Sequence, residues 1–286
     1  MSRLDIQKTY KLYIGGKFPR TESGRYYKVT DAKGNFIANM CLATRKDFRN
    51  AVVAARKIQC SWAGATALNK GQILYRIAEM LEGRKEQFIN ELIAQGETKK
   101  AAQKEVEASI DRLVYYAGWS DKYQQFFSTV NPVSSSHFNF SSLEPVGVIS
   151  IIAPEEQGLL GLVSVIAPAI VGGNTVIVLA SESKPLSAIS FAEVLHSSDV
   201  PGGVVNILTG KKDELISYMA SHMDVNAIIY CGKGQDTIKT INELASNNVK
   251  RTIFYKKTDW NNEACESPYF IEKCQEVKTT WHPTKV

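Results

Sequence analysis

Five short, β-branched apolar runs alternate with helical stretches in the second part of the chain, and this alternation constrains the fold more than any other feature of the sequence. Runs that are apolar on both faces fit strands of a parallel sheet that helices cover on each side. The alternation predicts a doubly wound α/β domain, whose ligands bind at the carboxyl ends of the strands. The predicted strands are 146–153, 175–180, 204–208, 227–230 and 251–255, and the predicted helices are 159–171, 185–196, 211–221 and 235–246.

The first part of the chain is predicted to be mainly helical. Residues 11–39 hold the pair Gly15–Gly16 and a further Gly34 between short apolar runs, which favour an extended, hairpin-like structure. Thr44 and Asp47 then have the spacing of a capping box, and an apolar stripe at helical spacing follows them. Similar stripes predict a second helix around residues 73–81 and a third over about residues 101–116.

A Ser-rich stretch at residues 128–142 is the best linker candidate in the chain. We expect residues 1–143 to form the N-terminal hairpin, the helices and the start of a small β element. Residues 144–258 are expected to form the sheet and residues 259–286 a tail, all within one integrated domain. The longest apolar stretch, 158–173, contains a Pro and is shorter than the ~20 residues of a bilayer span, so it predicts a buried helix.

The composition excludes several function classes. Of the 286 residues, 44% are hydrophobic and 22% are charged, which is ordinary for a globular protein. A formal net charge of +5 spread over this length does not indicate a nucleic-acid surface. The five Cys include no CxxC pair and the four His stand singly, so neither a disulfide framework nor a metal site is predicted. We therefore expect a cytoplasmic protein with reduced thiols and without a membrane, metal or nucleic-acid partner.

A series of short motifs follows a fixed order along the chain: SWAG at 61–64, YYAGW at 115–119, EPVGV at 144–148, APA at 167–169, GNTV at 173–176 and PGGVVN at 201–206. Together they resemble the N-terminal, cofactor-binding half of the aldehyde dehydrogenase superfamily. The segments 154–156, 222–225 and 281–283 are most similar to the C-terminal, truncated dehydrogenase-like module of aldehyde dehydrogenase family 16 proteins. The resemblance implies a Rossmann-like cofactor domain with a small β bridging element and without the catalytic domain.

The resemblance also implies NAD as cofactor, bound weakly or no longer bound. In the family, a Lys and a Glu after the second strand hold the adenosine ribose; here Leu179 replaces the Lys and Glu182 is retained. Gly232 would permit close approach of the pyrophosphate and Lys233 would meet a phosphate by charge, although Gly232 fits a plain strand–helix turn equally well. The implied cofactor-binding residues are Pro154, Glu182, Gly210, Gly232 and Lys233.

The positions that carry catalysis in the family differ in this chain. Glu156 stands where an Asn amide donates to the oxyanion, and a carboxylate there would repel the developing charge. Tyr255 replaces the general base Glu, and a phenol with a pKa of about 10 is mostly protonated near neutrality. The nucleophilic Cys belongs to the domain that is absent, and Cys265 and Cys274 are predicted to be ordinary thiols. No catalytic residue is therefore assigned.

Three other clusters are given structural interpretations. Glu155 and Glu156 are predicted to cap a helix N-terminus rather than to act as an acid–base pair. The basic pairs at 250–251 and 256–257 bracket a strand and are predicted to form its solvated edge. The aromatic residues within 115–123 fall at helical spacing and are predicted to pack in a core rather than to stack on bases.

These observations leave two functional hypotheses from different classes. The first is a non-catalytic pseudoenzyme module for assembly or regulation, as a homodimer or docked on a complete aldehyde dehydrogenase domain. Family members oligomerise through a bridging hairpin and a returning strand, which residues 138–152 and 270–281 would supply here. The second is an NAD-binding domain that senses cofactor or works with a catalytic domain on another chain. Oxidation of aldehydes would need that separate domain.

Overall fold

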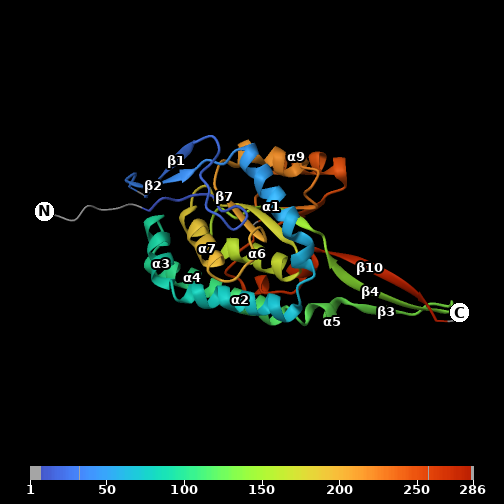
Figure 1. Cartoon of the computed structure of the whole chain (residues 1–286). Helices are drawn as coiled ribbons and strands as arrows, with labels where there is room; N and C mark the ends of the chain where they lie inside the picture. The colour runs from blue at the N-terminus through green and yellow to red at the C-terminus, as the bar shows by residue number, and fades with distance from the viewer. Residues whose placement is uncertain (1–7, 32, 257, 285–286) are drawn as a thin grey trace.

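The centre of the protein is a five-stranded parallel sheet, in a computed structural model that describes residues 8–31, 33–256 and 258–284. Its strand order is β7-β6-β5-β8-β9, so the sheet is doubly wound as predicted (Figure 1). Every predicted strand and helix of this region is confirmed to within two residues. The strands are β5 (Val148–Ile152), β6 (Thr175–Leu179), β7 (Val205–Leu208), β8 (Ala227–Tyr230) and β9 (Arg251–Phe254), and the helices are α6 (Leu160–Val171), α7 (Leu186–His196), α8 (Lys212–Ser221) and α9 (Gln235–Ala245).

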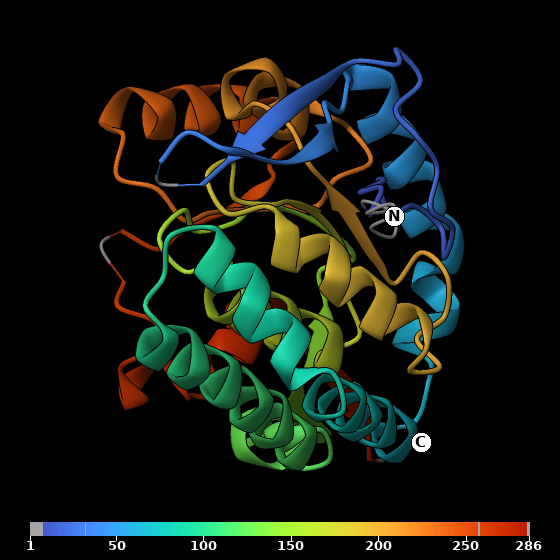
Figure 2. The same ribbon diagram turned by 90° about the vertical axis from the view of Figure 1, so that its left-hand side faces the viewer.

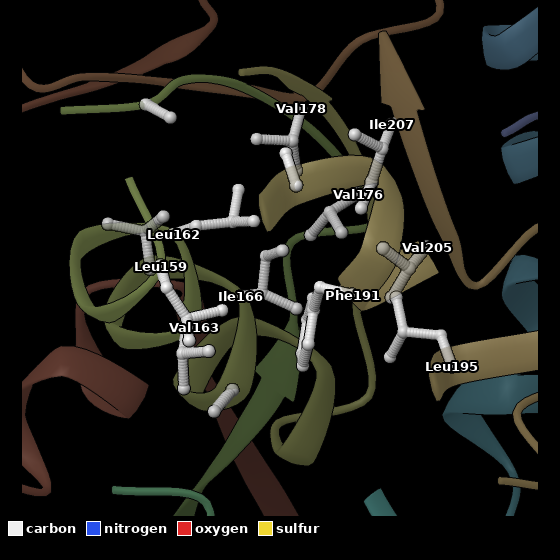
Figure 3. Packing of buried hydrophobic residues seen from close by; sticks show 14 of the residues in the cluster. Leu159, Leu162, Val163, Ile166, Val176, Val178, Phe191, Leu195, Val205 and Ile207 are labelled. Atoms are coloured by element: carbon white, nitrogen blue, oxygen red, sulfur yellow. The ribbon is translucent and has the colours of Figure 1, made fainter. Parts of the chain in front are cut away.

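Both faces of this sheet are buried, because successive side chains of each strand enter opposite cores. In β5, Ile149 and Ile151 join the core under α6 and α7, whereas Val148 and Ile152 join the core under α8 and α9. Figure 3 shows Ile166 of α6 and other side chains of the first core packed against β6 and β7. Each face therefore has its own helical layer, which leaves the strand ends as the place for a ligand.

The helix α6 is buried at every position, as predicted for the long apolar stretch. It crosses the centre of one face of the sheet and is far too short to span a bilayer. Within the described part of the chain, no helix combines the length and the apolar character that a membrane span requires.

The N-terminal part forms a hairpin and a group of helices. The capping box is confirmed: the Thr44 side chain accepts from the Asp47 backbone, and the Asp47 carboxylate accepts from the Thr44 N–H at 2.8 Å. Figure 2 shows the helices that follow α1 gathered beside α7. The helix over residues 85–94 was not predicted. The elements are β1 (Tyr26–Thr30), β2 (Phe36–Cys41), α1 (Arg45–Ala63), α2 (Ala67–Glu82), α3 (Lys85–Ala94), α4 (Lys99–Trp119) and α5 (Tyr123–Phe127).

A second, three-stranded antiparallel sheet projects from the body, and we call it the arm (Figure 1). It consists of β3 (Thr129–Asn131), β4 (His137–Pro145) and β10 (Gln275–Pro283), in the order β10-β4-β3. The pairing of β10 with β4 runs without interruption from Gln275 opposite Pro145 to Pro283 opposite His137. Segments more than a hundred residues apart in the sequence thus build one element.

The arm corrects two predictions and confirms a third. The Ser-rich stretch 128–142 is not a linker, because β3 and most of β4 lie in it and pair with each other. The hairpin predicted over 138–152 is wrong as well, because β5 turns away into the parallel sheet and β4 forms its hairpin with β3. The returning strand is confirmed, although it begins at Gln275, and Phe270 lies in a short helix before it.

The segment between β9 and β10 folds back on the body, with η2 (Glu263–Cys265) and α10 (Tyr269–Glu272) along its course. Arg112 of α4 is 2% exposed and joins three parts of the protein. Its guanidinium donates to the Ser164 hydroxyl at 2.6 Å, to the Trp260 carbonyl at 3.1 Å and to the Glu266 carboxylate at 3.3 Å. The neighbouring Tyr116 is fully buried, as predicted for the aromatic residues of this helix.

The basic pair that precedes and opens β9 is not a solvated edge, so that prediction is wrong. Lys250 is only 7% exposed, and its ammonium donates to the carbonyls of His222 at 2.8 Å and Val225. Arg251 donates to the Gln275 carbonyl at 2.6 Å and thereby ties β9 to the start of the arm. Lys257, the last residue of the second pair, lies outside the described residues.

Candidate functional site

A small cavity opens at the carboxyl ends of β5, β8 and β9, where a doubly wound sheet binds its ligand. Its volume is about 180 Å³. The turns after the three strands and the start of the tail supply its walls. The lining residues are Ile152, Ala153, Pro154, Glu155, Glu156, Lys212, Tyr230, Cys231, Gly232, Lys233, Tyr255, Thr258 and Trp260.

The five implied cofactor-binding residues do not share this cavity. Pro154, Gly232 and Lys233 line it, whereas Glu182 and Gly210 do not. Gly210 is buried behind β7, where a Cβ atom would come within 3.3 Å of a backbone nitrogen of the β2–α1 turn, so its contact is with the protein backbone. The structure therefore brings together only the three residues that the β5 and β8 turns supply.

Glu182 directs its carboxylate to the start of α8. It accepts from the backbone N–H of Lys212 and from the Lys211 ammonium at 3.3 Å. A carboxylate at a helix N-terminus satisfies free backbone donors and interacts favourably with the helix dipole. The residue implied to hold a ribose thus caps a helix of its own chain.

Of the two acidic residues that line the cavity, Glu155 makes more polar contacts than Glu156, and the sequence did not predict these contacts. Its carboxylate accepts from the Ser181 hydroxyl at 2.8 Å and from the backbone N–H groups of Glu182 at 3.0 Å and Ser183 at 3.2 Å. It also forms an ion pair with Lys212 at 2.8 Å. Burial raises the pKa of Glu155, but the hydrogen bond and charge of Lys212, together with the hydrogen bonds from Ser181 and Ser183, hold this pKa below its ordinary value.

Neither Glu155 nor Glu156 caps the helix that follows them, so that prediction is wrong. Glu156 is exposed and pairs with Lys233 at 2.9 Å. The N-terminus of α6 is instead capped from α4, where the buried Glu105 accepts from the N–H groups of Leu159 at 2.9 Å and its successor. Burial raises the pKa of Glu105 despite these two hydrogen bonds. A cap from another helix carries no local sequence signal.

The turn between β8 and α9 is covered by the phenol of Tyr230. A side chain on Gly232 would collide with the ring and hydroxyl of Tyr230, so Gly232 is needed there to admit this phenol. Tyr230 is 7% exposed and its ring faces the cavity rather than solvent. The contact with Tyr230 explains why a Gly stands at position 232, and it favours the interpretation of Gly232 as part of a plain strand–helix turn.

Tyr255 lies in an aromatic cluster that the tail completes. Its ring centroid is 5.5 Å from that of Trp260 and 5.1 Å from that of Phe270, and the Lys273 ammonium lies 5.1 Å from it. Burial, and then nearby thiols, raise the pKa of Tyr255 above its ordinary value. A phenol that holds its proton this firmly is a poor general base near neutrality.

The thiols of the tail have no features of a nucleophile. Cys265 and Cys274 are both buried, and burial raises the pKa of each, to about 12 for Cys274. A reactive Cys needs the opposite shift, because the thiolate is the attacking form. Among the described residues, no three His, Cys, Asp or Glu side chains come together as a metal-binding group.

Comparison with known proteins places this sheet and its cavity in a family. The family model described as "Aldehyde dehydrogenase family" matches residues 18–255. The chain belongs to the aldehyde dehydrogenase family. The match includes all five implied cofactor-binding residues, whereas β10 lies beyond it.

Relatives in the aldehyde dehydrogenase family are longer than this chain. Cytosolic 10-formyltetrahydrofolate dehydrogenase of Mus musculus is 31% identical over 257 residues, which are 88% of this chain and 28% of that protein. Aldehyde dehydrogenase, cytosolic 1 of Elephantulus edwardii is 32% identical over 258 residues, again 88% of this chain but 50% of the relative. The chain thus spans half or less of the length of these curated relatives.

Solved structures of the family confirm the fold. The NAD+ complex of an aldehyde dehydrogenase from Bacillus cereus superimposes with a TM-score of 0.82 at 25% identity, over 87% of this chain and 51% of that one. A putative aldehyde dehydrogenase from Burkholderia cenocepacia gives the same TM-score at 28% identity. The described residues therefore have the architecture of one half of an aldehyde dehydrogenase.

Proposed function

We propose that this chain is a non-catalytic aldehyde dehydrogenase-like module that acts in assembly, through homodimerisation of its arm or through docking of the arm on a complete aldehyde dehydrogenase domain. One observation carries the proposal. In the arm, β4 pairs along its whole length with β10, and the sheet extends away from the body (Figure 1). Its outer strands β10 and β3 each leave one edge without a partner strand in the described part of the chain, and eight of the nine residues of β10 are not buried. Open strand edges and exposed apolar faces are the usual means by which one chain adds to another.

Several large apolar side chains are exposed on the arm. Val130, Phe138, Val277 and Trp281 are each between 46% and 68% exposed. A groove of about 350 Å³ runs along β3 and β4, with Phe138 and Phe140 in its wall. Exposed apolar patches of this kind mark protein–protein contacts, and a two-fold pairing of β10 edges would place identical patches against each other.

The departures at the catalytic positions support a non-catalytic role. The exposed carboxylate of Glu156 stands at the position implied for an oxyanion donor, and the buried phenol of Tyr255 at the position implied for the base. The segments similar to the truncated module of family 16 proteins fit the same role, because that module follows a complete dehydrogenase domain. The cytosolic name of the mouse relative supports a cytoplasmic location.

A second candidate function is the binding of NAD on behalf of a catalytic domain supplied by another chain. It is favoured by the close superposition on a family structure solved as an NAD+ complex. The two candidates differ in a simple observable, since the first requires association through the arm and the second requires saturable NADH binding.

Analytical ultracentrifugation over a wide concentration range tests the assembly role. We expect a concentration-dependent dimer that Val277→Ser weakens at least about tenfold, a loss of 1.4 kcal/mol of association energy. Val53→Ser is the matched control, because Val53 of α1 is similarly exposed, at 60% against 66%, but lies on the body. A monomer throughout that also fails to bind a complete aldehyde dehydrogenase would contradict the proposal, as would equal effects of the two variants.

A further inference from the structure

The turn after β6 offers a set of hydrogen-bond donors that suits an anion. The Ser181 hydroxyl and the N–H groups of Glu182 and Ser183 converge within 2.8–3.2 Å of one oxygen atom. Successive backbone N–H groups of this kind form an anion-binding concavity. That oxygen belongs to Glu155 from the turn after β5, so the protein supplies the anion itself.

The ion pair of Glu155 with Lys212 separates the two halves of the implied dinucleotide site. Both side chains line the cavity, and their charged atoms are 2.8 Å apart. Glu182 lies beyond this pair and is held by the backbone N–H of Lys212. A ribose contacting Glu182 and a pyrophosphate over Gly232 would therefore need Glu155 and Lys212 to separate, at the cost of a partly buried ion pair.

The second half of the site is obstructed by Tyr230. Its hydroxyl lies 3.5 Å from where a Cβ atom would stand on Gly234, the residue that opens α9. An anion approaching the N-terminus of α9 would meet this phenol before it reached the free backbone donors. The remaining cavity, about 180 Å³, is smaller than the 300–1,000 Å³ typical of pockets for drug-sized ligands.

We infer that the chain fills its own dinucleotide site, with the Glu155 carboxylate in the donor set after β6 and the Tyr230 phenol over the β8–α9 turn, and that it does not bind NAD. Glu155 and Tyr230 occupy the positions that NAD would need, so the residues of this site do not fit the cofactor that the resemblance implies. The inference is independent of the assembly role, because it concerns the strand ends of the body and the assembly role concerns the arm. NADH binding would therefore overturn this inference alone, and a loss of association through the arm would contradict the assembly role alone.

Titration of the full chain with NADH, followed by nucleotide fluorescence, is the first test. We expect no saturable binding up to about 1 mM, which corresponds to less than 4.1 kcal/mol of binding free energy. Saturable binding at micromolar NADH would overturn the inference whatever the variants show.

Glu155→Ala tests whether the internal carboxylate closes the site. The substitution leaves the donors after β6 and the Lys212 ammonium without their anion, so inorganic pyrophosphate should bind at least about tenfold more tightly than to the unmodified chain. Glu156→Ala is the matched control: it frees the Lys233 ammonium but uncovers no backbone donors, and pyrophosphate binding should stay at the original level.

Isothermal titration calorimetry measures both variants after circular dichroism has shown that they are folded. Equal pyrophosphate affinity of folded Glu155→Ala and the unmodified chain would overturn the role of Glu155. An equal gain in both variants would also overturn it, because any freed lysine would then suffice. If Glu155→Ala does not fold, Glu155→Ser replaces it, and the NADH titration of the unmodified chain decides the inference on its own.

Discussion

The body and the arm each contain a sheet with regular backbone pairing, but the strands of the body are buried and those of the arm are mostly exposed or half-buried. All five residues of β5 and all five of β6 are buried, whereas only the first of the nine residues of β10 is buried. In the body, a slip of one residue would turn a strand's apolar side chains toward the wrong core, so burial fixes the register. In the arm, burial does little to fix the register, because most side chains of β10 are exposed on either face.

The arm keeps its register through its base instead. Asn174 donates to the Cys274 carbonyl at 2.9 Å and accepts from the Gly147 N–H at 2.9 Å, while Gln275 donates to the Gly172 carbonyl at 3.1 Å. These bonds fix where β4 leaves the body and where β10 joins it. The arm is thus held at its base, while the rest of β10 is exposed or only half-buried. This difference supports the assembly role.

The same substitution in the two regions should have very different effects on stability. Phe191 of α7 is fully buried against β6 and β7 (Figure 3), so Phe191→Ala should lower the free energy of unfolding by about 3–5 kcal/mol through lost burial and a cavity. Phe138 of β4 is 46% exposed, so Phe138→Ala should change it by less than about 0.5 kcal/mol.

Urea denaturation at concentrations where the chain is monomeric measures both Phe variants. Low concentration is needed because a dimer would add its association energy to the apparent stability of the arm. Comparable losses in Phe191→Ala and Phe138→Ala would mean that the arm is packed as tightly as the body, and the contrast between the regions would not hold.

The base of the arm provides an intermediate case. Gln275→Ala removes the donor to the Gly172 carbonyl at the end of α6, which should cost about 1–2 kcal/mol because a buried acceptor loses its partner. Hydrogen exchange of the β4 and β10 amides should accelerate, whereas that of β5 should not. Gln103→Ala is the control, since Gln103 makes only an exposed bond to Glu107. Unchanged exchange in β10 would show that the base does not hold the arm.

The two regions also differ in how much of them the sequence predicts. The body was predictable because its strands are short, β-branched and mostly apolar on both faces, a pattern that is typical of a parallel sheet covered by helices on each side. The Ser-rich sequence of residues 128–142 predicts a linker, because the strands β3 and β4 within it are mostly not buried and lack the continuous apolar pattern of the body. The returning strand of the arm could be predicted only through the resemblance to a family with a bridging element.

The candidate site was predicted at the level of turns but not of contacts. The sequence places Pro154, Gly232 and Lys233 at the strand ends, where the structure finds a cavity. It does not show that Glu155 reaches the turn after β6 or that Lys212 meets it, because these partners are 26–57 residues apart along the chain. Long-range polar pairs of this kind arise only from the packing of the strands.

The smallest expected effect comes from the buried lysine at the start of β9, compared with an exposed lysine of the arm. Burial lowers the pKa of Lys250 from 10.5 to about 8. Between these values the unfolded chain binds a proton that the folded chain does not, so Lys250 makes the free energy of unfolding rise with pH across this range. From about pH 7 to pH 9 the contribution of Lys250 should be a rise of the order of 1 kcal/mol.

Buried thiols contribute in the opposite direction toward pH 9, because burial raises the pKa of Cys265 and Cys274 and the unfolded chain loses these protons first. The contribution of Lys250 is therefore the difference between the slope of the unmodified chain and that of Lys250→Met. Lys278→Met, which removes an exposed arm lysine paired with Glu144, should leave the slope unchanged. Urea denaturation at several pH values measures the three slopes. Equal slopes in Lys250→Met and the unmodified chain would show that Lys250 does not contribute, and would remove one of the distinctions between body and arm.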